Sequence, residues 1–100
     1  MNKSTSFDSY LERRLSDPKL ACQFIIQAIE ENDSEYLKVA LGEIVKAYGV
    51  SDIAVQTGLT RQTIYKMLSK TGNPTHKNLI AILDSLGLEL TVRTKKKEAS

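Results

Sequence analysis

The chain has 100 residues, 41% of them hydrophobic, which predicts a single domain with a modest core. Its one cysteine, Cys22, excludes an intramolecular disulfide and is too few for a cysteine-based zinc site, so we expect a core thiol in a reducing cytoplasm and neither a metal nor a cofactor. The net charge is +2, no apolar run approaches the roughly 18 residues of a membrane span, and the polar start lacks the apolar core of a signal peptide, so a soluble cytoplasmic protein without a membrane partner is expected.

Residues 1–16 are expected to form a short N-terminal helix or arm. Phe7, Tyr10, Leu11 and Leu15 recur there at helical spacing. Asp17 and Pro18 then combine an N-cap residue with a proline that is tolerated at the first helical position, and they predict a helix to about residue 31. The apolar face of this helix is expected to comprise Ala21, Phe24, Ile25, Ala28 and Ile29.

A third helix is predicted after the polar residues 32–34, which interrupt the apolar pattern and supply its cap. Gly49 is expected to end this helix, because glycine adopts the left-handed conformation common at helix C-termini. Its buried side chains are predicted to be Leu37, Ala40, Leu41, Ile44, Val45 and Tyr48. We expect this helix and the one before it to pack against the elements that follow.

The stretch 51–69 is predicted to form two short helices bent around one glycine. Ser51 is expected to cap the first helix by accepting from backbone N–H groups, with Val50 and Val55 in the positions of a hydrophobic staple. Gly58 follows the periodic residues of this helix, where a chain that leaves a helix usually needs a left-handed conformation. The first helix is therefore expected to end there.

Thr60 is predicted to cap the second helix, which begins near Arg61. Leu59 and Ile64 occupy the two staple positions that set the entry angle of this helix. Two helices that cross steeply after a short turn need a small residue at the crossing and an apolar residue facing it. The residues that meet this need are Ala54, Gly58 and Ile64.

The second helix leaves a polar face to solvent once its apolar residues are packed. The apolar residues are Ile64, Met67 and Leu68, and the remaining side chains are Arg61, Gln62, Tyr65, Lys66 and Ser69. Arg, Gln and Lys are suited to base edges and phosphates in the major groove of double-stranded DNA. The pattern therefore predicts a DNA-binding helix-turn-helix. The alternative is an ordinary polar surface helix in a small bundle, since any globular helix has such a face.

The distribution of charge agrees with a DNA-binding surface in the second half of the chain. From Ile53 to Leu83 there is no Asp or Glu, while Arg61, Lys66, Lys70 and Lys77 carry positive charge. Residues 1–50 instead hold eight acidic residues against six basic ones. A polyanion is attracted to the region from Ile53 to Leu83, so the acidic residues 1–50 are expected to face away from DNA.

Residues 70–74 are predicted to form a loop, followed by a helix that Thr75 caps and Gly87 ends. The apolar residues of that helix are Leu79, Ile80, Ile82, Leu83 and Leu86. The polar side chains beside the loop that could contact phosphates are Lys70, Asn73 and Lys77. The alternative is an ordinary solvated turn.

Residues 88–94 alternate apolar and polar side chains with period two, which predicts a short β-strand. No other segment offers a comparable partner, so the strand either lies extended over the core or pairs with a second copy or with another protein's sheet edge. We expect a homodimer, with Leu88, Leu90 and Val92 at the pairing strand. A two-fold dimer would bind an inverted-repeat operator. Lys95, Lys96 and Lys97 belong to a basic tail, 95–100, which adds attraction without reading sequence.

Four blocks of the sequence together resemble the small addiction-module antidote proteins of bacteria, in particular the HigA-like antitoxins with a phage-repressor-type helix-turn-helix. The blocks are LSDPKLACQFIIQAI, GVSDIAVQTGLTRQTIYKMLS, GNPT and ILDSLGLELTV, and the similarity covers about residues 11 to 93. The resemblance implies an all-α domain of five to six helices, lambda-repressor-like, over residues 17–94, with a short C-terminal β-strand. It also implies an antitoxin that neutralises a RelE-like ribonuclease toxin encoded next to it and represses their shared promoter.

Roles for individual residues follow from the same resemblance. Phage-type repressors read base edges with the N-terminal part of the second helix, which corresponds to Thr60, Arg61, Gln62, Tyr65 and Lys66. The start of the preceding helix, at Ser51, would contact phosphate. Arginine has the geometry for guanine and glutamine for adenine.

Three other classes of function remain as alternatives. An enzyme is disfavoured, because the chain has one histidine, one cysteine and no glycine-rich phosphate loop. A protein-interaction module with a non-functional helix-turn-helix would bind a partner through its acidic helices and lone strand. A stand-alone prophage-type regulator without a toxin differs from the antitoxin only in what the neighbouring gene encodes.

Overall fold

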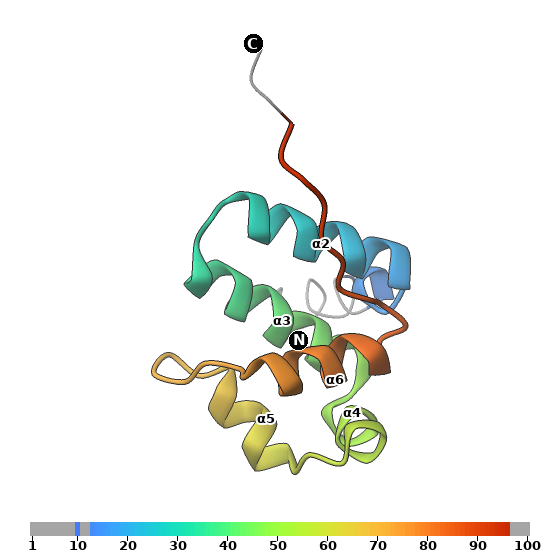
Figure 1. Cartoon of the computed structure of the whole chain (residues 1–100). Helices are drawn as coiled ribbons and strands as arrows, with labels where there is room; N and C mark the ends of the chain where they lie inside the picture. The colour runs from blue at the N-terminus through green and yellow to red at the C-terminus, as the bar shows by residue number, and fades with distance from the viewer. Residues whose placement is uncertain (1–9, 11–12, 97–100) are drawn as a thin grey trace.

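The computed structural model describes residue 10 and residues 13–96 of the chain (Figure 1). Within them lie five complete helices: α2 (Pro18–Glu30), α3 (Ser34–Tyr48), α4 (Val50–Thr57), α5 (Arg61–Met67) and α6 (His76–Ser85). Residues 13–15 are also helical, and none of the described residues belongs to a β-strand. The predicted all-α class is confirmed for this part of the chain. The expected contributions of Phe7, Leu11 and Lys97 fall outside the described residues.

Short-range capping explains where most of the helices begin. The carboxylate of Asp17 accepts from the Lys19 N–H at 2.9 Å, with Pro18 as the first helical residue. Asp33 accepts from the Glu35 N–H at 2.9 Å in the same way. These caps satisfy backbone donors that the first turn of a helix leaves without partners. The hydroxyls of Thr60 and Thr75 cap α5 and α6, so all four caps agree with the prediction.

The predicted cap at Ser51 is wrong. A cap at Ser51 would start the helix at Asp52, but α4 begins two residues earlier, at Val50, and its N-cap is Gly49, which makes no side-chain cap hydrogen bond. The expected staple also fails, because Val55 is 84% exposed. Gly49 has a φ of +98° and is both the C-cap of α3 and the N-cap of α4. Because only Gly49 separates α3 from α4, Ser51 already lies inside α4 and cannot be its N-cap.

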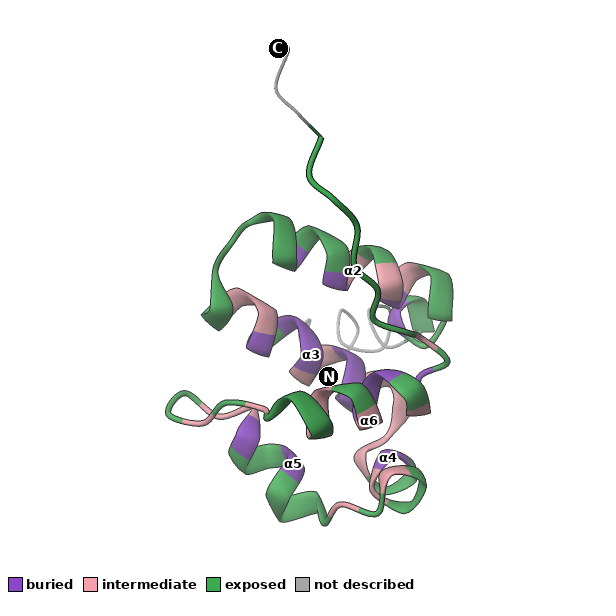
Figure 2. Ribbon diagram, in the orientation of Figure 1, coloured by how far each residue is buried: buried purple, intermediate pink, exposed green. Residues whose placement is uncertain are grey.

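The core lies where α2 and α3 run side by side and where α4 meets α3, α5 and α6 (Figures 1 and 2). Its fully buried members include Leu41, Ile44, Ile53, Ile64, Ile82 and Leu86. Two predicted core residues are exposed instead: Ile29 is 50% exposed and Ile80 is 36% exposed. Cys22 is half-buried. An apolar face identifies which side of a helix avoids water, but it does not guarantee that another element covers every residue.

The predicted C-terminal strand is absent from the described residues. After Gly87, whose φ is +78°, the chain runs extended past α2 and away from the helices (Figure 1). Leu88 packs against the core, whereas Leu90 and Val92 are exposed. A strand is defined by ladder hydrogen bonds to a second strand, and the described chain contains none that could supply them.

Candidate nucleic-acid interface

The turn between α4 and α5 is built around a glycine in the left-handed conformation. Gly58 is left-handed, with φ +78° and ψ 5°, and its N–H donates to the Ala54 carbonyl at 2.9 Å. A Cβ on Gly58 would meet open space, so the need for glycine here comes from the backbone conformation. Thr57 closes the turn, because its hydroxyl donates to the Ile53 carbonyl at 2.8 Å and accepts from the Leu59 N–H at 3.2 Å.

One face of α5 is anchored in the core and the other is open. Ile64 and Met67 are buried, and Ala54 on α4 is half-buried. At the N-terminus of α5 the Thr60 hydroxyl accepts from the Thr63 N–H at 3.0 Å and donates to the Thr63 hydroxyl at 2.9 Å. The exposed side chains of the helix are Arg61, Gln62, Thr63, Tyr65 and Lys66.

The remaining residues predicted to bind DNA lie in elements that flank α5. Ser51 is exposed in the first turn of α4, and Lys77 is exposed in the first turn of α6. Lys70 and Asn73 are exposed in the loop that follows α5. Ser69 differs from these, because it is half-buried and its hydroxyl donates to the Lys66 carbonyl at 2.7 Å.

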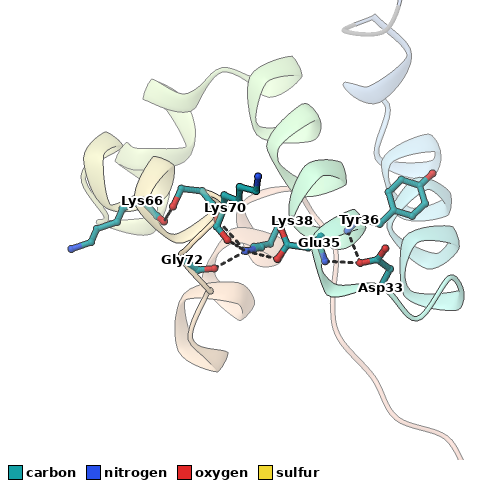
Figure 3. Close-up of polar contacts among 8 residues, drawn as sticks. Asp33, Glu35, Tyr36, Lys38, Lys66, Lys70 and Gly72 are labelled. Carbon is teal, nitrogen blue, oxygen red and sulfur yellow. Dashed lines mark hydrogen bonds and ion pairs between the residues drawn. The ribbon is translucent and has the colours of Figure 1, made fainter.

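The loop that follows α5 is held by a lysine from α3, Lys38 (Figure 3). Its ammonium donates to the carbonyls of Ser69 at 3.0 Å, Lys70 at 3.0 Å and Gly72 at 2.8 Å. The ammonium also lies 3.2 Å from a carboxylate oxygen of Glu35, and Lys38 is only 5% exposed. These acceptors offset the cost of burying the ammonium, because a charge in a protein interior is unfavourable unless it is paired and hydrogen-bonded. We call this group of five residues the Lys38 clamp.

Gly72 lets the loop approach the last turn of α5 closely. A Cβ at this position would overlap the backbone carbonyl of Lys66, so no larger residue fits without movement of the main chain. The Gly72 N–H donates to the Ser69 carbonyl at 3.1 Å, which closes the same turn. Together with the Lys38 clamp, this contact fixes the segment that carries Lys70 and Asn73.

The Lys38 clamp is not among the sites predicted from the sequence, where Lys38 is only one of the six basic residues in 1–50. A signal was nevertheless present, because Lys38 precedes Leu41 and Val45 by three and seven residues and so lies on the buried face of α3. A lysine in that position needs hydrogen-bond acceptors inside the protein.

Other kinds of site find little support in the described part of the chain. No group of His, Cys, Asp and Glu there could hold a metal ion. No helix in the same residues is long and apolar enough to cross a bilayer. The phenol of Tyr48 has a shifted pKa: burial raises it, and the negative charge of Asp17 raises it further. The buried hydroxyl of Tyr48 has no hydrogen-bond partner among the described residues. Tyr48 is the last residue of α3.

Comparison with known proteins gives a family. The profile described as "Probable addiction module antidote protein" matches residues 3–94 of the chain. The chain belongs to this family. A member of the curated proteins, an uncharacterised protein of Haemophilus influenzae (strain ATCC 51907 / DSM 11121 / KW20 / Rd), is 34% identical over 70 residues, which are 70% of this chain and 72% of that protein. No solved structure matches. The antidote part of the resemblance stated from the sequence is thereby confirmed.

Proposed function

We propose that the chain is the antitoxin of a type II toxin-antitoxin module and that it represses the shared promoter by binding DNA through α5. Membership of the antidote family supports the antitoxin role. The observation that carries the DNA-binding role is the open face of α5: Arg61, Gln62, Tyr65 and Lys66 are exposed on a helix whose opposite face is buried behind a glycine hinge. A helix presented in this way can enter the major groove.

Charge supports the same surface. The segment from Ile53 to Leu83, which contains α5 and both of its flanking turns, has no carboxylate side chain. Helices α4 and α5 lie at one end of the molecule, opposite α2, and the loop after α5 projects to the side at the level of α6 (Figure 1). Phosphates would therefore meet the exposed Lys70, Asn73 and Lys77 on one side of α5 and Ser51 on the other.

The two kinds of contact are expected to have different energetic signatures. Arg61 would pair with guanine and Gln62 with adenine, and loss of either would cost roughly 1–3 kcal/mol on the cognate site. Lys66, Lys70 and Lys77 would contact phosphates, so their loss would weaken binding to every sequence and reduce its salt dependence. Thr60 would contribute through its cap as well as by contact, since its hydroxyl is engaged with Thr63.

A homodimer would place two α5 helices on successive major-groove faces, about 34 Å apart, and would require an inverted-repeat operator. The exposed Leu90 and Val92 support such an interface, because apolar side chains of that size gain from being covered. Leu88 packs on the core of its own chain and would anchor the segment.

Salt-titrated binding to the DNA upstream of the protein's own gene tests the DNA-binding role. Arg61→Ala should lose affinity for this DNA and little for a scrambled duplex, whereas Lys70→Ala should lose affinity for both. The matched control is Arg13→Ala, which removes an exposed arginine from the acidic half of the chain. Equal losses of Arg61→Ala on all sequences, or no binding by the unaltered protein, would refute base reading by α5.

The toxin is tested separately. The adjacent gene should encode a small basic RelE-like ribonuclease, whose growth inhibition is relieved and which co-purifies when this chain is co-expressed. Absence of such a gene, with DNA binding intact, would leave a stand-alone regulator. Toxin binding without DNA binding would instead favour a protein-interaction module.

A further inference from the structure

Exposed apolar side chains gather along α2 and the C-terminal segment 88–94. Ile26 and Ile29 of α2 are 48% and 50% exposed, and Leu90 and Val92 of the segment are 47% and 91% exposed. A groove of about 260 Å³ between them is lined by both elements. Figure 2 shows the exposed segment passing the exposed side of α2. So much apolar surface in one place indicates an interaction site.

The backbone of the same segment is unpaired. The Leu88 N–H donates to the Leu83 carbonyl at 2.8 Å, but beyond it residues 89–96 make no backbone hydrogen bond to the rest of the described chain. An extended segment with open N–H and C=O groups is a template for another strand. A partner that binds here would therefore need apolar side chains to bury those of α2 and the segment 88–94, and a strand to pair with the backbone of that segment.

We propose that a second copy of this chain is the occupant, and that the segments Leu88–Thr94 of the two copies pair antiparallel about a two-fold axis at Thr91. In this register Glu89 lies opposite Arg93 of the second copy, and Leu90 lies opposite Val92. Each pair occurs twice because of the symmetry. Opposite charges and matched apolar side chains directly across an antiparallel pair are favourable.

In neighbouring registers, fewer of these residues lie opposite a side chain of matching type. An axis at Leu90 puts Glu89 opposite Thr91 and leaves Arg93 opposite Gly87. An axis at Val92 puts Leu90 opposite Thr94 and Arg93 opposite Thr91. A slip by one residue on one chain alone would set apolar side chains opposite polar ones. The axis at Thr91 is the register in which Glu89 and Arg93 both meet an opposite charge while Leu90 and Val92 both meet an apolar side chain.

The helices give this ribbon the support that a two-stranded pair needs. An isolated pair of strands is marginal in water, and stability requires packing against another element. Here Leu90 lines the groove beside Ile25, Ile26 and Ile29, so each strand lies against the α2 of its own copy. Pairing would then cover Val92 and complete an apolar layer across the two copies.

Disulfide cross-linking measures the register directly, in the full chain with Cys22→Ala to remove the native thiol. Residues directly opposite in an antiparallel pair have Cα atoms about 4.5–5.5 Å apart, within the range of a disulfide, whereas diagonal neighbours are about 7–8 Å apart. Thr91→Cys should therefore cross-link with itself under mild oxidation. Leu90→Cys and Val92→Cys should cross-link poorly alone and well when mixed. Strongest cross-linking of Leu90→Cys or Val92→Cys alone, or no cross-linking at any of the three, would overturn the proposal.

Charge reversal supplies a second readout that requires no cysteine. Glu89→Arg and Arg93→Glu, measured by sedimentation equilibrium, should each weaken the dimer by about tenfold, since two opposed pairs become like-charged. The double variant Glu89→Arg/Arg93→Glu should restore the affinity. Lys96→Glu, with the same charge change as Arg93→Glu but outside the paired residues, should leave it unchanged. A double variant as weak as the single ones, or a monomeric unaltered protein, would refute the register.

This inference rests on the two-fold dimer of the proposed function, but the cross-linking and the sedimentation experiments are both done without DNA, so they test the dimer separately from DNA binding. A paired dimer that binds no operator would remove the repressor role alone, and a DNA-binding protein without these cross-links would remove the pairing alone.

Discussion

Replacement of Lys38 by methionine tests how the loop after α5 is positioned. Methionine keeps the length and apolar stem of the side chain but removes the ammonium. Three carbonyls, those of Ser69, Lys70 and Gly72, then lose a charged donor at 2.8 to 3.0 Å. The carboxylate of Glu35 loses its ion-pair partner as well.

The expected loss of stability follows from these contacts. A hydrogen bond to a charged group contributes about 1.5–3 kcal/mol, but the three bonds share one ammonium whose burial is itself unfavourable, so their energies do not add. The carbonyls are part-buried, and water can reach some of them once the loop moves. We therefore expect a loss of about 2–4 kcal/mol. For a chain of this size, that lowers the melting temperature by roughly 10–20 °C.

Thermal unfolding followed by circular dichroism measures this change. Glu35→Gln should lose less than about 1 kcal/mol, because the carboxylate is 60% exposed and its ion pair is screened by water. Lys19→Met is the matched control, an exposed lysine on α2 whose replacement should change stability by less than about 0.5 kcal/mol. Amide hydrogen exchange should accelerate selectively at residues 69–72 in Lys38→Met.

Two results would refute the reasoning. One is a Lys38→Met variant that melts within about 2 °C of the unaltered protein, which would mean that the three carbonyls do not depend on the ammonium. The other is an equal loss in Lys19→Met, which would indicate a general effect of charge. If the proposed DNA-binding role holds, Lys38→Met should also weaken operator binding at a temperature where it remains folded, since Lys70 and Asn73 lie in the released loop.

Further predictions concern glycines, caps and the buried phenol, each measured by chemical denaturation. Gly58→Ala should lower the free energy of unfolding by about 1–2 kcal/mol because of the left-handed backbone alone, and Gly72→Ala should lower it more because the new Cβ overlaps the Lys66 carbonyl. Gly42→Ala, in mid-helix with nothing within 4 Å, should raise it by about 0.5–1 kcal/mol. A Gly72→Ala variant as stable as Gly42→Ala would contradict the close approach. Thr60→Ala should lose about 1 kcal/mol with its cap, while Ser51→Ala should change by less than about 0.5 kcal/mol because Ser51 caps nothing, and the reverse order would restore the original prediction for Ser51. Tyr48→Phe should be neutral or stabilising by up to about 1 kcal/mol, since it removes a buried hydroxyl without a partner, and a clear loss would reveal a hydrogen bond to that hydroxyl.

Features that depend on neighbours a few residues apart could be predicted from the sequence. The caps at Asp17, Asp33, Thr60 and Thr75 join groups two or three residues apart, and each is present in the structure. The left-handed turn at Gly58 is local in the same sense. The polar face of α5 followed from helical periodicity once the ends of that helix were known. These local signals were sufficient to place the proposed DNA-reading residues on one exposed helix.

Local signals were insufficient where two residues could each serve as the N-cap of a helix, or where no second element packs on an apolar face. Ser51 is a good cap by type, yet Gly49 takes the position because α3 and α4 are joined by that single residue. Ile29 follows the apolar pattern of α2, but no element of the described chain buries it. Residues 88–94 alternate like a strand, but strand structure requires a partner that one chain does not contain.

The sequence by itself thus determined which segments become helices, the caps of four of them, and the stretch from Ile53 to Leu83 that is free of carboxylates. Only the tertiary structure decided that Lys38, in the acidic half, holds the loop after α5 through carbonyls more than thirty positions away. The physical reason is that backbone carbonyls are the same for every residue type. A sequence therefore gives no indication of which of them will accept a hydrogen bond from a distant ammonium until folding has brought the two together.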